Sequence, residues 1–201
     1  MTAIRLQLEA EGLGHLWSDG DLEAIATELA RRSDRAGVAS AEGRSLHLAV
    51  GLAEFWRGEF PASMAILDEV VAAAAEHADD RTAMVGHSVR GMITAFRGDL
   101  AGSDAEFALA IDHAVRADAP AADVTVRSMR IAVSEEPSWD ELEAEIEACR
   151  RIVARLDGVS GPVGSTVDLA EGWALASTGR FDDAIAMLER AARGMDAPLE
   201  R

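Results

Sequence analysis

A chain of 201 residues with 49% hydrophobic and only 4% aromatic residues can bury a sizeable core, and its composition favours helices over strands. The formal net charge of −17 comes from 36 acidic and 19 basic residues, and every basic residue is an arginine. Such a surface repels nucleic-acid phosphates and anionic lipid headgroups, and the absence of lysine excludes a Schiff-base lysine and a phosphate-loop lysine.

Targeting signals are not evident in the sequence. The longest apolar run, Val70–Ala75, is far shorter than the roughly 20 residues that span a bilayer. Residues 1–10 contain charges and lack the apolar segment of a signal peptide. A lone cysteine, Cys149, builds no disulfide framework. We therefore expect a cytoplasmic protein that does not enter a membrane.

Apolar residues recur at helical spacing along the whole chain and predict ten helices paired into five hairpins. In chain order, the predicted pairs are residues 3–18 and 21–36, 42–57 and 60–77, 81–97 and 100–117, 121–134 and 139–156, and 165–178 and 181–195. Strand-like alternation is essentially absent, and we interpret Val124–Val126 as helix. The predicted fold is all-α, a single helical-repeat domain over residues 1–201.

A repeated pattern supports this pairing. The segments Gly51–Phe60, Gly91–Leu100 and Gly172–Phe181 each carry two glycines seven residues apart, followed by a charged and a large apolar residue. Small or apolar residues follow three, seven and ten positions later, on one face of a helix. Two weaker copies surround Gly20 and Pro137. The turns are therefore about 40 residues apart, as in stacked helical hairpins.

Capping residues mark several predicted helix ends. Asp21 and Asp99 are candidate N-caps, and Ser138 with Glu141 has the spacing of a capping box. The glycine-rich segment 157–165 predicts the clearest loop, after which Ser165 with Asp168 would cap the next helix.

The spacing of Gly51, Gly58, Phe60, Ser63 and Leu67 resembles the tetratricopeptide repeat (TPR), and the other two strong copies resemble it as well. The resemblance implies an α-solenoid of about five TPR-like hairpins. These repeats are longer than the 34 residues of that family, and His47, His87 and Asp168 replace its usual aromatic residue. The last copy, Leu169–Phe181, is also similar to helical-repeat regions of bacterial LuxR-type activators and signal-transduction ATPases.

A stack of hairpins curves, and the first helix of each pair lines its concave face. We expect a protein or peptide partner to bind there, on apolar side chains with few charges. The candidate partner-binding residues are Trp17, Leu48, Leu52, Phe55, Trp56, Ser88, Met92, Phe96, Arg127, Ile131, Leu169 and Trp173. The alternative for each aromatic residue is packing against the neighbouring repeat. No polar capping helix is evident after Ala191 and Ala192, so we expect either a piece of a longer solenoid or homo-oligomer contacts through the terminal hairpins. The third interpretation is that the acidic last hairpin is polar enough by itself.

Catalytic and metal-binding patterns were sought and not found. The five histidines lack metal-ligand spacing, and Cys149 lies on the apolar face of its helix, so we expect a buried, inert thiol. Gly161–Thr166 lacks the lysine and glycine spacing of a phosphate loop, and Gly158–Gly161 is not a nucleophile elbow. We expect a non-enzyme without cofactor or metal.

The leading hypothesis is therefore a protein–protein interaction scaffold without direct nucleic-acid contact, as a regulatory or sensor segment of a bacterial transcriptional or signalling protein. The alternative is a small-ligand effector domain, with Trp56, Met92 and Phe96 around an apolar pocket.

Overall fold

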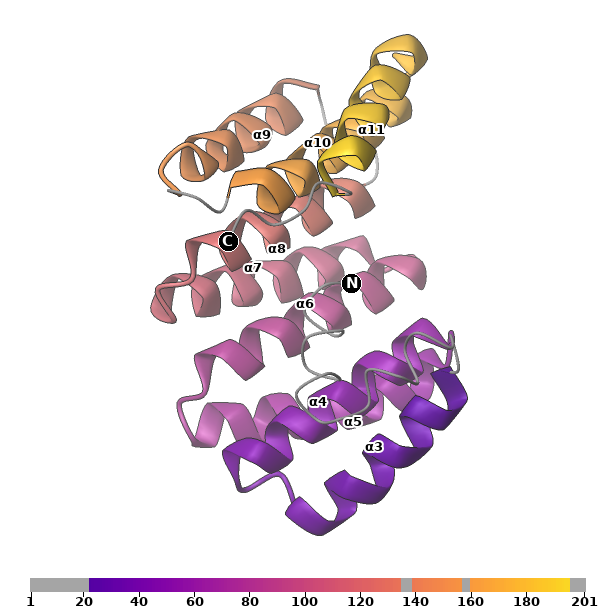
Figure 1. Cartoon of the computed structure of the whole chain (residues 1–201), viewed down its shortest axis with the longest axis vertical. Coiled ribbons are helices and arrows are strands. Elements are labelled where there is room, and N and C mark those ends of the chain that lie inside the picture. The colour runs from indigo at the N-terminus through magenta and orange to yellow at the C-terminus, as the bar shows by residue number, and fades with distance from the viewer. Residues whose placement is uncertain (1–21, 135–138, 157–159, 196–201) are drawn as a thin grey trace. The chain divides into compact units, whose positions relative to one another are not determined.

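The computed structural model describes residues 22–134, 139–156 and 160–195, and within these ranges it contains helices and no strand (Figure 1). The helices of the described ranges are α3 (Leu22–Ala36), α4 (Ala41–Trp56), α5 (Phe60–Glu76), α6 (Asp80–Phe96), α7 (Leu100–Arg116), α8 (Pro120–Val133), α9 (Trp139–Val153), α10 (Ser160–Ser177) and α11 (Phe181–Met195). The all-α prediction is confirmed. Nine helices are described against the ten expected, because the predicted helix 3–18 lies outside the described residues.

One predicted boundary is wrong. Helix α10 begins at Ser160, so most of the predicted loop 157–165 is helical, and Ser165 is a buried helical residue rather than an N-cap. Pro162 is the third residue of this helix, where its missing N–H would have had no intrahelical partner. Elsewhere the predicted helices begin and end within three residues of the observed ones. Asp99 is the N-cap that the sequence predicts, because its carboxylate accepts from the Gly102 N–H at 2.9 Å. The predicted caps Asp21 and Ser138 lie outside the described residues.

The turns inside the hairpins depend on glycine. Gly58, Gly98 and Gly179 all have φ near +80° (79°, 80° and 78°), a left-handed conformation that is costly for residues with a Cβ. At each turn the next N–H reaches back to a carbonyl five residues earlier, as from Glu59 to Glu54 at 3.0 Å. These three turn positions are therefore confirmed, whereas Gly20 and Pro137 lie outside the described residues.

Contacts along the chain divide it into two compact units between Ile93 and Thr94, and each unit is described by itself. The expectation of one domain over residues 1–201 stays a prediction. In the first unit, α3 packs on α4, where Ile25, Ala26 and Leu29 meet apolar residues of α4. Helix α4 then pairs with α5, and α6 packs on that hairpin.

The α4–α5–α6 core is held by apolar packing and by one buried ion pair. Its cluster combines Leu48 and Phe55 of α4, Leu67 and Val70 of α5, and Val89 and Ile93 of α6. The Arg44 Nε of α4 donates to the Asp79 carboxylate at 2.9 Å, and Asp79 caps α6 by accepting from the Thr82 N–H and hydroxyl. Burial alone would raise the pKa of Asp79, but these donors outweigh it and lower that pKa.

The second unit repeats the arrangement of a covered hairpin. Helices α8 and α9 form a hairpin, and α10 packs against both of them (Figure 1). Their common cluster contains three residues of α8–α9 that are almost fully buried, Val124, Ile146 and Cys149. Helix α10 contributes Val167, Ala170 and Ala174, of which Ala170 and Ala174 are the repeat equivalents of Val89 and Ile93. Helix α11 pairs with α10.

In both hairpins, α4–α5 and α10–α11, a glycine of the first helix lies close to a leucine of the second. A Cβ added at Gly51 would lie 3.0 Å from the Leu67 Cδ2, and one added at Gly172 would lie 2.7 Å from the Leu188 Cδ2. Both glycines occupy the same repeat position, and so do both leucines. In the first hairpin the buried Ser63 hydroxyl also donates to the Gly51 carbonyl at 2.7 Å. Repeat-equivalent residues of the two hairpins therefore occupy equivalent places on them.

Candidate functional site

The residues that the sequence places in a partner groove fall into three environments. Leu48, Phe55, Ser88 and Ile131 are buried, so in this structure they stabilise the core and are closed to a partner. Leu52 and Met92 are half-buried against the α4–α5–α6 cluster, and Arg127 is half-buried between the carboxylates of Asp123 and Glu145. Trp56, Phe96, Leu169 and Trp173 are exposed, and Trp17 lies outside the described residues.

Large apolar side chains are exposed together on the hairpin α10–α11. Leu169 and Trp173 of α10 are 36% and 54% exposed, and Phe181 and Ile185 of α11 are 65% and 57% exposed. Each pair is four residues apart, so each lies on one face of its helix. Leu188 follows on the same face of α11 and is half-buried. We call these five residues the α10–α11 surface.

The hairpin α4–α5 has apolar residues at the five equivalent positions, but there they are covered by α6. The equivalent positions are Leu48 and Leu169, Leu52 and Trp173, Phe60 and Phe181, Met64 and Ile185, and Leu67 and Leu188. All five residues of α4–α5 belong to, or pack against, the cluster that includes Val89 and Ile93 of α6. Leu67 is fully buried there at 0% exposure. The α10–α11 surface is therefore the counterpart of the one that α6 covers, and no helix of the described chain covers it.

Three members of this surface were missed by the sequence-based prediction. Phe181, Ile185 and Leu188 lie on the second helix of their pair, whereas the predicted groove used first helices only. Phe181 and Leu188 stand at aligned positions of the repeat pattern, whereas Ile185 does not. The signal that could have found all three is their helical spacing of four and three residues along α11.

Ion pairs join α10 to α9 and to α11. The Arg190 Nε of α11 donates to the Asp168 carboxylate of α10 at 2.7 Å, and Arg150 of α9 pairs with Glu171 of α10. Burial raises the pKa of Glu171, and the two arginines oppose that rise. On the exposed side of α11, Glu189 is 64% exposed and lies 3.7 Å from Arg193. Such an exposed pair contributes little stability and leaves Glu189 open to another cation.

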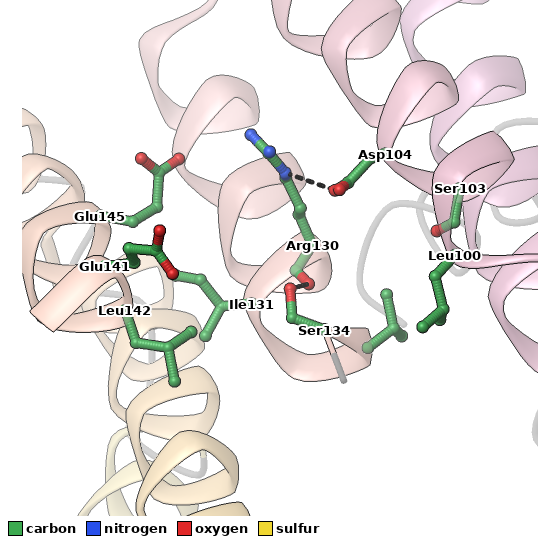
Figure 2. Close-up of a pocket in the computed structure, with 10 residues that line it drawn as sticks. Leu100, Ser103, Asp104, Arg130, Ile131, Ser134, Glu141, Leu142 and Glu145 are labelled. Carbon is green, nitrogen blue, oxygen red and sulfur yellow. Dashed lines mark hydrogen bonds and ion pairs between the residues drawn. The ribbon is translucent and has the colours of Figure 1, made fainter. Parts of the chain in front are cut away.

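A cavity of about 460 Å³ lies among α7, α8 and α9, and Figure 2 shows its lining. Arg130 donates through Nε to the Asp104 carboxylate at 3.0 Å, and the Ser134 hydroxyl donates to the Arg130 carbonyl at 2.8 Å (Figure 2). Glu145, on the opposite wall, accepts from Arg127 at 2.9 Å. The lining contains the serines Ser103 and Ser134, three carboxylates and Arg130, and neither histidine nor cysteine. A second cavity, of about 400 Å³, includes Arg150 and Arg190, which already hold carboxylates.

The reactive side chains of the described part of the chain include one cysteine, Cys149. Cys149 is fully buried, and burial raises the pKa of its thiol to about 12, so the thiolate is not available as a nucleophile. The prediction of a buried thiol is confirmed. Among the described residues, no three His, Cys, Asp or Glu side chains are placed to hold one metal ion.

Comparison with protein-family models finds no match for this chain, and comparisons with curated proteins and with solved structures find none. The helix-on-helix packing is compatible with a helical repeat. The resemblance to the tetratricopeptide repeat therefore depends on the repeat pattern itself. None of the described helices is both long and apolar enough to cross a bilayer.

Proposed function

We propose that this chain is a non-enzymatic protein–protein interaction scaffold, an α-solenoid of TPR-like hairpins that binds a protein partner on the α10–α11 surface. The observation that carries the proposal is the exposure of Trp173, Phe181 and Ile185 at positions whose equivalents pack against a third helix. Contiguous apolar surface of this kind marks interaction sites, and tryptophan is enriched among binding anchors.

The arrangement inside each unit supports the solenoid. In both units a helix packs across the preceding hairpin with repeat-equivalent residues, Val89 and Ile93 in one and Ala170 and Ala174 in the other. A hairpin that cannot bury its apolar face alone is stabilised in this way by the next one. The same logic makes the exposed apolar face of α10–α11 a place where a partner would add.

The biological setting follows from charge and resemblance. An acidic chain of net charge −17 is unsuited to direct nucleic-acid or membrane contact, so a protein partner in the cytoplasm is the best match. A regulatory segment of a bacterial transcriptional or signalling protein agrees with the similarity of Leu169–Phe181 to such regions. The alternative, a small-ligand effector domain, has less support, because the two cavities described above have charged linings.

Site-specific photocrosslinking tests the proposal. A photoreactive phenylalanine analogue at Ile185 should give discrete protein adducts in cells that express the full chain. The same analogue at Asp112, an exposed position on α7, is the matched control and should give none of these adducts. Equal adduct patterns at both positions, or none at Ile185, would refute the proposed site.

A further inference from the structure

The chain contains its own example of an element that fits the surface of a hairpin. Helix α6 covers α4–α5 with Val85, Val89, Met92 and Ile93, which pack on the cluster that includes Leu48 and Leu67. Their spacing of four, three and one residues makes a single apolar stripe along one helix. Close approach is allowed by Gly86, where an added Cβ would lie 2.6 Å from the Val71 Cγ2 of α5. The covering element is thus a helix of 17 residues with a small residue at its contact point.

An ion pair also joins α6 to α5. The Arg90 Nε of α6 lies 3.5 Å from the Asp68 carboxylate on the exposed side of α5. The repeat equivalent of Asp68 on α11 is Glu189, another carboxylate, which is 64% exposed. On α4–α5, helix α6 contacts apolar residues and a neighbouring acidic residue, Asp68. The hairpin α10–α11 has both: the apolar residues of its surface and Glu189.

We infer that the α10–α11 surface binds an amphipathic helix of a partner protein, with an apolar stripe like that of α6 and an arginine or lysine that pairs with Glu189. The inference rests on the proposed function and names the class of partner. The partner helix lies across α10 and α11 as α6 lies across α4 and α5. Its side chains bury Trp173 and Ile185, and its basic residue replaces the loose contact between Arg193 and Glu189.

A second copy of the chain fits this surface less well than a separate partner. The α6 stripe is occupied within its own copy, because Val89 is 6% exposed and Ile93 is fully buried. Two α10–α11 surfaces facing one another would bring together exposed acidic residues of both copies, Asp182, Asp183 and Glu189 among them. The net charge of −17 on each copy opposes that contact further.

The probe for a direct test is a synthetic, end-capped peptide of residues 79–97, which contains α6 and its N-cap Asp79. Fluorescence anisotropy of the labelled peptide is measured against the full chain at low ionic strength. Saturable binding is expected. Ile185→Glu should weaken peptide binding about tenfold or more, because it places a charge where the bound peptide would bury an apolar side chain. Leu109→Glu, at an exposed apolar residue of α7, is the matched control and should leave it unchanged.

A charge exchange locates the peptide. Glu189→Arg should weaken binding several-fold, and the peptide variant Arg90→Glu should restore it. Asp68→Arg in the chain should leave peptide binding unchanged. A peptide that instead displaced native α6 from α4–α5 would lie beside Asp68, and its binding would change in this variant. Binding that ignores Ile185→Glu, or that follows Asp68 rather than Glu189, would overturn the inference. So would self-association that Ile185→Glu abolishes in the absence of peptide, measured by analytical ultracentrifugation.

The two proposals fail in different ways. If protein adducts form at Ile185 while the peptide does not bind, the scaffold function stands and the helical partner is wrong. If neither is observed, the α10–α11 surface is not an interaction site.

Discussion

The hairpins α4–α5 and α10–α11 have the same close approach of a glycine to a leucine, and apolar residues at the same repeat positions. In the first, α6 covers the apolar face, and Leu67 is fully buried. In the second, no described helix covers it, and Phe181 is 65% exposed. The same repeat pattern therefore forms core or surface according to whether another helix covers it. The predictions below test that comparison.

The largest expected effect concerns the ion pair that holds α6 on its hairpin. Arg44→Met should lower the free energy of unfolding by about 3 kcal/mol, because it leaves the partly buried Asp79 carboxylate without its cation. Arg57→Met is the matched control, since it removes a pair with Glu54 within one helix, and it should cost less than about 0.5 kcal/mol. Chemical denaturation measures both. Equal losses of unfolding free energy in the two variants would mean that the Arg44–Asp79 pair stabilises the fold no more than an exposed pair does.

The same pair predicts a pH dependence. Because the pKa of Asp79 is lowered in the folded chain, the pair stabilises the fold fully above the ordinary aspartate pKa, near pH 4. That contribution is lost as the pH falls through the lowered value. Unfolding curves between about pH 5 and pH 2 should therefore show a smaller acid-dependent loss in Arg44→Met than in the unchanged chain. A parallel pH dependence in both proteins would contradict this assignment.

A smaller effect compares the two surfaces directly. Met64→Glu places a carboxylate against the covered cluster and should cost about 2 kcal/mol of unfolding free energy. Ile185→Glu makes a similar change at the equivalent exposed position and should cost less than about 0.5 kcal/mol in the isolated chain. Thermal and chemical unfolding of the two variants check this difference. A large loss in Ile185→Glu would show that the α10–α11 surface is already covered.

The smallest effect is a gain in stability where the chain leaves the α4–α5 hairpin. Ala78 has φ of 51°, in the left-handed region that is costly for a residue with a Cβ. Ala78→Gly should therefore raise the unfolding free energy by about 1 kcal/mol. Ala75→Gly, at an exposed position inside α5, should lower it by a similar amount and serves as the control. A loss in both variants would contradict the strain at Ala78.

Sequence reasoning succeeded where local chemistry decides the structure. The turn glycines, Asp99 as a cap and the helical spacing of apolar residues determine helix ends without reference to tertiary contacts. It failed at Ser160, because Gly161 and Pro162 are typical of loops, although a helix tolerates proline in its first turn.

The candidate site could be predicted only in part. Leu48 and Leu169 look alike in the repeat pattern, yet one is 7% and the other 36% exposed. Their environments depend on whether a covering helix is present, which is a tertiary property that periodicity does not report.

The most direct measurement of the central claim is the rate at which cysteines at the two equivalent positions react with a thiol reagent. Cys149 is buried and its thiol pKa is raised to about 12, so the native cysteine adds little background. In the isolated native chain, Ile185→Cys should react at least about tenfold faster than Met64→Cys, and the two should react alike in denaturant. Equal slow reaction at both positions would contradict the account, because it would show that the α10–α11 surface is not open.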